Sequence, residues 1–413
     1  MIMPTGLCLP FLTDAHLRLH QEAQDFAASR LAGPARRMEA RGPHTDRDVR
    51  EILSGTGWLG LLIDTADGGL GLDHTAKTLV LQAVSRVSPA AGAILQASIL
   101  GAAPIAEYGS VELRRRLLPE IAAGRCWPSI AVTDPEHGSH VLGMQATARP
   151  SRGQYILDGE KVLVGNAALA DVHCVIVRTD QPGHRDRDEP GRGGSLTAFL
   201  VEQDAPGVTV VPAPVNGLHG FSVDTLRLTR VRVPAANMIG EPGDGHAIAQ
   251  MASVVYGRLN LAAVALGIHQ QMLDETARRV TTRRRLGGHL ADLPTVRHHI
   301  ALMQHHLMTA ELAAYHAARL LDAGTDCDPW LHNAKLTAHR AGAASSELAK
   351  QLYGGHAARL GEPIEQLRRD IDLIHAPAGT DDLQLLRLAE SVLGPHRPQW
   401  STQHAARRAL RAA

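Results

Sequence analysis

Residues 131–140 read Ala-Val-Thr-Asp-Pro-Glu-His-Gly-Ser-His. They begin with the end of a short run that is rich in Val, Ile and Thr and closes in a polar turn. Similar runs, separated by Gly, Asp and Pro, lie at 145–148, 154–164, 172–178, 197–201, 208–211 and 226–233. Apolar residues at every second position between turn residues predict a compact antiparallel β-domain from about residue 128 to residue 234.

On both sides of this region the apolar period changes to three or four residues, which predicts helices. The N-terminal side shows the period within 17–26, 78–87 and 113–121, and the C-terminal side within 248–284, 295–321 and 330–352. Paired long helices of the second kind usually pack as an antiparallel bundle. Helices, then strands, then helices make an α+β fold, with expected domains at 1–125, 126–240 and 241–413.

Composition excludes several classes of protein. The 413 residues contain 42 basic and 42 acidic side chains, so no charge pattern points to a nucleic acid or an anionic membrane. Neither G-x-G-x-x-G after a first strand nor G-x-x-x-x-G-K-[ST] occurs, which disfavours Rossmann and phosphate-loop nucleotide sites. Cys8, Cys126, Cys174 and Cys327 are scattered, so we expect neither a disulfide framework nor a metal site.

Two segments bear on location and order. The first residues, MIMPTGLCLPFL, are apolar but lack a basic start, so we expect no signal peptide, no membrane span and a cytoplasmic protein. Residues 181–194 carry Gly, Pro and alternating charges without an apolar anchor, which is typical of a solvated, mobile loop.

Six motifs in order resemble those of the acyl-CoA dehydrogenase family, and the resemblance covers nearly the whole chain. The motifs are Gly57-Trp-Leu-Gly-Leu with Gly68-Gly-Leu-Gly-Leu, the 131–140 stretch, Tyr155-Ile-Leu-Asp-Gly-Glu-Lys, Val231-Arg-Val-Pro-Ala-Ala-Asn-Met-Ile-Gly, Gln351-Leu-Tyr-Gly-Gly, and Arg369-Asp370 with Gly379-Thr380. The resemblance implies a central antiparallel β-barrel, a C-terminal four-helix bundle and bound FAD.

The resemblance also implies which residues bind FAD. Val132 and Thr133 would bind the pyrimidine edge of the flavin, and Ser139, after a glycine, would contact the diphosphate through a turn of converging N–H groups. In this family FAD lies across a dimer contact, which implies a homodimer or homotetramer. The residues that would reach the neighbouring subunit's FAD are Arg283, Leu286, Gln351, Gly354 and Gly355, and Thr380 and Asp382 match further FAD positions.

The departures from the family pattern concern the chemistry. The family's glutamate base precedes the Gly-Thr motif, where this chain has Ala378, or stands before an arginine that matches Arg258, where it has Gly257. Alanine and glycine cannot accept a proton. At two flavin-facing positions Leu163 replaces a tryptophan and Gly165 replaces a hydroxyl residue. Arg258 is retained and is implied to lie at the substrate site.

The sequence leaves three functions open. One is dehydrogenation of an acyl thioester on CoA or an acyl carrier protein, as in polyketide-type biosynthesis, with electrons passing to an acceptor flavoprotein. It would use a substitute base, for which Asp381 is a weak candidate and Tyr256 no better supported, or a substrate of different acidity. The second is a flavin-dependent monooxygenase or oxidase that uses oxygen. The third is a non-catalytic homologue that binds flavin or an acyl chain.

Overall fold

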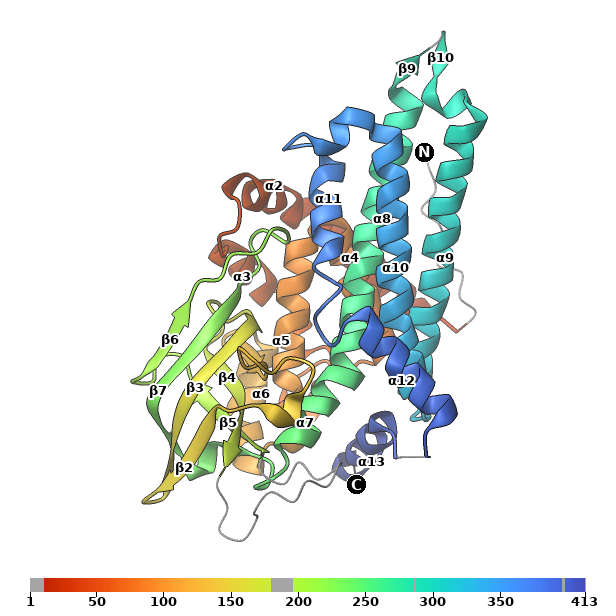
Figure 1. Cartoon of the computed structure of the whole chain (residues 1–413). Helices are drawn as coiled ribbons and strands as arrows, with labels where there is room; N and C mark the ends of the chain where they lie inside the picture. The colour runs from red at the N-terminus through yellow and green to blue at the C-terminus, as the bar shows by residue number, and fades with distance from the viewer. Residues whose placement is uncertain (1–10, 180–195, 286, 396–397, 413) are drawn as a thin grey trace.

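The computed structural model describes residues 11–179, 196–285, 287–395 and 398–412. Helices occupy both ends of the chain and strands lie between them, in the predicted order (Figure 1). The expected division at 125/126 falls between the last N-terminal helix and the first strand, and that at 240/241 falls before the C-terminal helices. The loop expected at 181–194 and the segment around Cys8 lie outside the described residues.

The N-terminal helices begin at polar caps. Side chains of Thr13, Asp46, Asp73, Ser88 and Ser110 accept hydrogen bonds from the first-turn N–H groups of five helices, which would otherwise lack partners. The helices are α1 (Asp14–Phe26), α2 (Ala32–Arg41), α3 (Arg47–Ser54), α4 (His74–Val87), α5 (Pro89–Tyr108) and α6 (Val111–Ala122).

The central strands form one sheet with the order β6-β7-β3-β2-β4-β5-β8, and β1 pairs with β4 outside that path. Their bounds are β1 (Pro128–Ala131), β2 (Thr147–Ser151), β3 (Gln154–Gly165), β4 (Val172–Thr179), β5 (Leu196–Glu202), β6 (Val208–Val211), β7 (Val223–Pro234) and β8 (Met238–Ile239). The sheet is antiparallel as predicted in most of its pairs, but β1 and β2 both pair with β4 in parallel. Strands of either direction show an apolar period of two, so the sequence pattern cannot reveal strand direction.

The C-terminal helices contain the predicted bundle, formed by α8, α9, α10 and α11. A segment of π-helix, Ala252–Gly257, joins α7 to α8 without a break, and such insertions are frequent at functional sites. The helices are α7 (Gly245–Met251), α8 (Arg258–Thr282), α9 (Pro294–Asp322), α10 (Asp328–Tyr353), α11 (Pro363–Asp372), α12 (Asp381–Leu393) and α13 (Trp400–Ala412); the short strands β9 (Arg284–Arg285) and β10 (Gly288–His289) form a hairpin.

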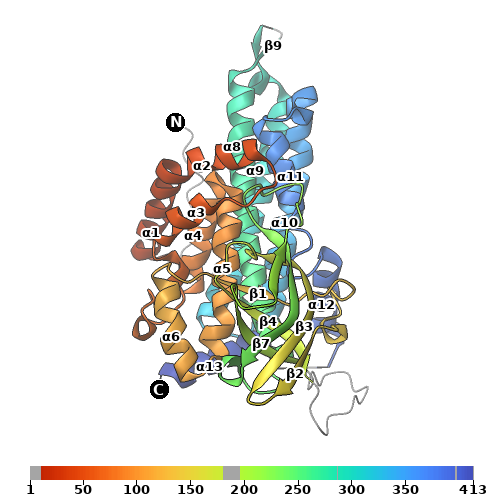
Figure 2. The ribbon, with the colours of Figure 1, turned by 90° about the vertical axis from the view of Figure 1, so that its left-hand side faces the viewer.

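Helix α5 lies between the sheet and the bundle, because it packs against β1 on one side and α8 on the other (Figure 2). Helix α4 packs along α8, so the two helical regions share one apolar core. Two helices, Pro89–Tyr108 and Gly245–Thr282, are long and apolar enough to cross a membrane, but 89% and 94% of their most apolar windows are buried inside the fold. Their composition therefore reflects a position in the core.

Candidate active site

The two positions that the sequence resemblance matches to the family's base lie together, although they are far apart in the sequence. Gly257 ends the π-helical segment, and Ala378 lies in the loop between α11 and α12. A Cβ atom on Gly257 would lie 3.3 Å from the Cβ of Ala378 and 3.8 Å from Cδ1 of Leu100 on α5. A carboxylate introduced at either position would therefore reach into the same small volume. In this chain neither position carries one.

The loop that holds Ala378 is fixed by buried side chains. Gln384 Nε2 donates to the carbonyl oxygens of Ala378 and Gly379 at 3.0 and 2.9 Å, and Lys335 Nζ donates to the carbonyl of His375 at 2.6 Å. Ala378 has φ 54°, in the left-handed region that non-glycine residues rarely occupy, at a cost of about 1–3 kcal/mol. This backbone is held in place by its surroundings, which is typical of a functional loop.

Arg258 lies beside this loop and is almost completely buried. Its Nε donates to Oε1 of Gln384 at 2.8 Å, and Nδ1 of His332 approaches the same oxygen at 2.7 Å. Nη1 of Arg258 is buried and has no hydrogen-bond partner among the described residues. Burial lowers the pKa of Arg258 to about 9, so the group stays charged at neutral pH. An orphaned cationic donor favours a ligand that carries an acceptor oxygen.

The end of β1 presents one side-chain hydroxyl, that of Thr133, where FAD is expected. The carbonyl of Val132 accepts from Lys161 Nζ at 2.9 Å, and the carbonyl of Thr133 accepts from the N–H of Val162 at 2.8 Å. The half-buried Thr133 hydroxyl has no protein partner among the described residues. Ser139 is exposed, and a Cβ on Gly138 would meet only the Thr133 side chain, at 3.8 Å. This open turn fits a bound diphosphate.

The diverged strand positions differ from the family pattern for a structural reason. Leu163 has φ 54° and lies where the register between β3 and β7 shifts, so its side chain is 63% exposed. At Gly165 a Cβ would lie 3.0 Å from Cζ of Phe221 and 3.4 Å from Cβ of Ala97. A hydroxyl residue at 165 would therefore crowd the Phe221 ring, which would have to give way by a few tenths of an ångström.

The residues expected to serve a second subunit's FAD lie at the far end of the bundle. Arg283 caps the end of α8 and is exposed, and Gln351, Gly354 and Gly355 are exposed at the end of α10. The two ends are neighbours, since the Arg279 guanidinium stacks on the Tyr353 ring at 4.3 Å. In Figure 1 the adjacent β9–β10 hairpin projects away from the β-domain. The arrangement fits a FAD shared between subunits; Leu286 lies outside the described residues.

The three candidate residues at the start of α12 differ in exposure and in hydrogen bonding. Thr380 caps the helix by accepting from the N–H of Leu383, and Asp382 is exposed. Asp381 is buried, and its carboxylate accepts from His339 Nδ1 and Arg340 Nε, each at 3.0 Å. Because both donors hold its carboxylate in place, Asp381 is not free to reach a substrate C–H, which disfavours it as the base.

Tyr256 belongs to a buried polar network that the sequence did not reveal. Its hydroxyl donates to Oε1 of Glu107 at 2.8 Å, and burial, the largest effect, raises its pKa well above the ordinary value. Tyr256 is therefore a donor and not a base. Burial opposes ionisation of Glu107, but His404, Arg411 and Tyr256 together lower its pKa to about 2. The network joins α5, the π-helical segment and α13, and no sequence period marks it.

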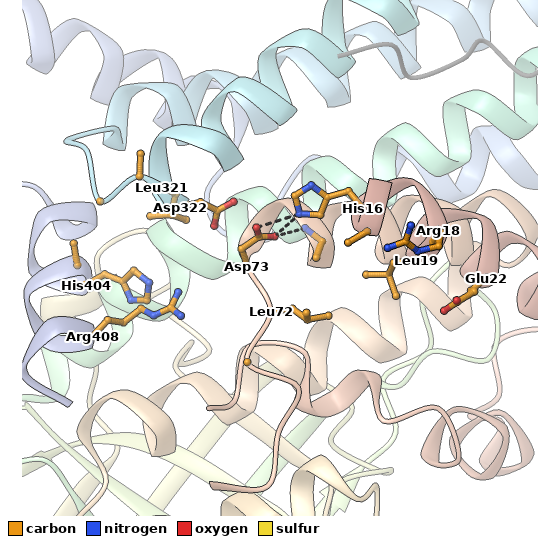
Figure 3. A pocket seen from close by; sticks show the side chains of 16 residues that line it. His16, Arg18, Leu19, Glu22, Leu72, Asp73, Leu321, Asp322, His404 and Arg408 are labelled. Carbon is orange, nitrogen blue, oxygen red and sulfur yellow. Dashed lines mark hydrogen bonds and ion pairs between the residues drawn. The ribbon is translucent and has the colours of Figure 1, made fainter. Parts of the chain in front are cut away.

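A separate cavity of about 680 Å³ lies between α1, α4, the end of α9 and α13 (Figure 3). Two of its carboxylates are engaged, since Asp73 pairs with His16 at 3.1 Å and Asp322 accepts from the N–H groups of His74 and Thr75. None of the residues expected to bind FAD or substrate lines this cavity.

Comparisons with known proteins show the family and the fold. Family models of the N-terminal, middle and C-terminal domains of acyl-CoA dehydrogenase match residues 13–125, 129–231 and 243–393. An acyl-CoA dehydrogenase of Bacillus subtilis (strain 168) is 30% identical over 385 residues, covering 93% of this chain and 99% of the relative.

Solved structures show the same fold. Butyryl-CoA dehydrogenase from Megasphaera elsdenii superposes with a TM-score of 0.87 at 25% identity, covering 92% of this chain and 99% of that one. The prolyl acyl carrier protein oxidase AnaB superposes with a TM-score of 0.83 at 24% identity, covering 92% of this chain and 100% of that one.

Proposed function

Because the chain belongs to the acyl-CoA dehydrogenase family of FAD-dependent oxidoreductases, we propose that it oxidises an acyl thioester without the family's glutamate base. The observation that carries the proposal is the pairing of Gly257 with Ala378. Both known base placements point into one volume, and both lack a carboxylate. FAD supplies the hydride acceptor when bound.

The remaining groups of the site support binding and polarisation of a thioester. The N–H of Ala378 donates to no described residue and is available to the thioester carbonyl, as the family resemblance implies. Arg258 offers an unpaired N–H beside the same loop. Both groups stabilise negative charge on an acyl oxygen, and this lowers the pKa of the adjacent C–H.

A substrate with an unusually acidic α-hydrogen suits this site. Asp381 is held by His339 and Arg340, and Tyr256 donates to Glu107, so neither replaces the missing glutamate. A plain fatty acyl thioester would lose its proton slowly here. We propose an activated acyl group, carried on CoA or on an acyl carrier protein, as in polyketide-type biosynthesis. The solved relative that acts on a carrier-bound prolyl group prompts the carrier alternative.

An oxygen-using oxidase or monooxygenase is the second candidate. It is favoured by the exposed Leu163 and by Gly165, which together leave the expected flavin face without an indole or a hydroxyl. The electron acceptor is then oxygen in place of an acceptor flavoprotein. We propose a homodimer or homotetramer in the cytoplasm for either candidate.

The test begins with the purified protein. A visible absorption spectrum reports FAD, and anaerobic mixing with thioesters of CoA and of a carrier protein reports flavin reduction. We expect bleaching by an activated thioester and none by butyryl-CoA on the same timescale. Product formation that needs a flavin reductant and oxygen would support the second candidate instead. Bound FAD with neither reaction would point to a non-catalytic homologue.

A further inference from the structure

Three potential metal ligands meet beside the candidate site. His339 lies on α10, His375 follows α11, and Asp381 is the first residue of α12. Nδ1 of His339 lies 3.0 Å and Nδ1 of His375 lies 3.8 Å from Oδ1 of Asp381. One nitrogen or oxygen atom from each of the three side chains lies within 4.8 Å of the other two.

These separations are close to those of a metal site. Zinc binds imidazole nitrogen and carboxylate oxygen at about 2.0–2.2 Å, so tetrahedral ligand atoms lie about 3.3 Å apart. The His339–Asp381 pair is already at that separation. His375 would have to close on Asp381 from 3.8 Å and on His339, whose ligand atom lies within 4.8 Å of its own. His375 is 49% exposed, so an ion can enter from solvent and retain a water ligand.

The neighbouring charges select the kind of ion. Arg340 Nε binds Oδ2 of Asp381 at 3.0 Å, which leaves Oδ1 directed at both imidazoles. Lys335 binds the carbonyl oxygens of His375 and Gly379 behind them. With two cations nearby and a single carboxylate, the site disfavours Mg²⁺ and Ca²⁺, which need several oxygen ligands. Two imidazoles and one carboxylate suit Zn²⁺, Co²⁺ or Ni²⁺.

We propose that His339, His375 and Asp381 form a binding site for a divalent transition metal, with Zn²⁺ as the best fit. On binding, the imidazole proton of His339 that now faces Asp381 moves to Nε2, and Nδ1 ligates the ion. The metal would join α10 and α12 to the loop that carries Ala378 and Thr380. Its effect on the protein is to stiffen the segment from 375 to 381. The site uses no cysteine, which is why cysteine spacing gave no sign of it.

The test uses flavin-loaded protein, as purified and then treated with a chelator, and titrates it with Co²⁺ alone. We expect one equivalent to produce the d–d absorption of a low-coordinate cobalt site, and Zn²⁺ to displace it. His375→Ala and His339→Ala should each weaken binding at least tenfold. The matched control is His305→Ala, which removes a histidine from the adjacent His305–His306 pair on α9 and should change nothing.

An independent arm needs no variant. Zn²⁺ should protect His375 from carbethoxylation, as read by mass spectrometry, while His305 reacts as before. Absence of a stoichiometric cobalt signal in the unaltered chain would overturn the proposal. So would equal affinity in His375→Ala, which would show that other histidines bind the metal adventitiously.

Discussion

Gly257 and Ala378 stand 121 residues apart in the sequence, yet a Cβ on the glycine would touch the Cβ of the alanine at 3.3 Å. The family resemblance of the sequence matches both positions to placements of one catalytic group, the glutamate base. Their contact explains how one catalytic group can stand at either position, because a side chain from either backbone reaches the same volume. In this chain neither position carries a carboxylate.

A double carboxylate should test that contact through stability. Ala378→Glu and Gly257→Glu place like charges about 4 Å apart, and their repulsion is on the order of 1–4 kcal/mol depending on solvent access. At pH 7 we expect the double variant to lose more free energy of unfolding than the two single variants lose together. Below pH 4 the two losses should be additive. Urea unfolding measures this. Additivity within about 0.5 kcal/mol at pH 7 would show that the side chains do not meet.

Gly165→Ser should destabilise the protein through crowding. The new Cβ would lie 3.0 Å from the Phe221 ring, and overpacking of this kind costs about 1–3 kcal/mol. The melting temperature should fall, and a second substitution, Phe221→Leu, should recover part of the loss. If the serine variant melts like the parent, Phe221 is not what requires glycine at 165.

Acid should destabilise the chain through buried histidines. Burial, the largest effect in each case, lowers the pKa of His173 to about 4 and the pKa values of His269 and His332 to about 3. In the unfolded chain these imidazoles protonate near pH 6.5. The stabilisation that each buried neutral imidazole gives the folded state is therefore complete above pH 6.5 and is lost as pH falls towards 3–4. At pH 5 each buried histidine should lower the free energy of unfolding by about 2 kcal/mol. Melting temperatures at pH 7 and pH 5 provide the measurement; equal values would contradict the assignment.

Glu107→Gln should be severely destabilising. The change leaves Arg411 and His404 without their buried carboxylate, and removal of one partner from such a cluster costs about 3–5 kcal/mol. Glu120→Gln is the matched control, because Glu120 pairs with Arg125 on the surface and its loss should leave unfolding unchanged. Equal effects of the two substitutions would show that the buried network stabilises the fold no more than a surface ion pair does.

Much of the architecture was predictable because it follows local periods. The runs at 154–164 and 226–233 became β3 and β7, and the long amphipathic segments became α9 and α10. The parallel pairing of β1 and β2 with β4 was not, since strand direction depends on where the intervening chain returns.

Only those residues of the candidate site that lie within recognisable motifs could be predicted from the sequence. Ala378 and Gly257 were recognisable as empty positions, but their contact is a tertiary property. Glu107 and His404 lie on helices whose apolar pattern does not mark them as partners. They come into contact only because α13 packs against α5. Asp381 looked like a candidate base from its place in the sequence, and its ion pair with Arg340 appears only in three dimensions.

The most direct measurement is the anaerobic rate at which butyryl-CoA bleaches the bound flavin. We expect a negligible rate for the unaltered chain and a rate at least a hundredfold higher for Ala378→Glu, because general-base catalysis contributes a factor on the order of 10²–10⁴. The rate for Gly257→Glu should also be raised. Fast bleaching by the unaltered chain, no slower than by either variant, would show that another base works in this site.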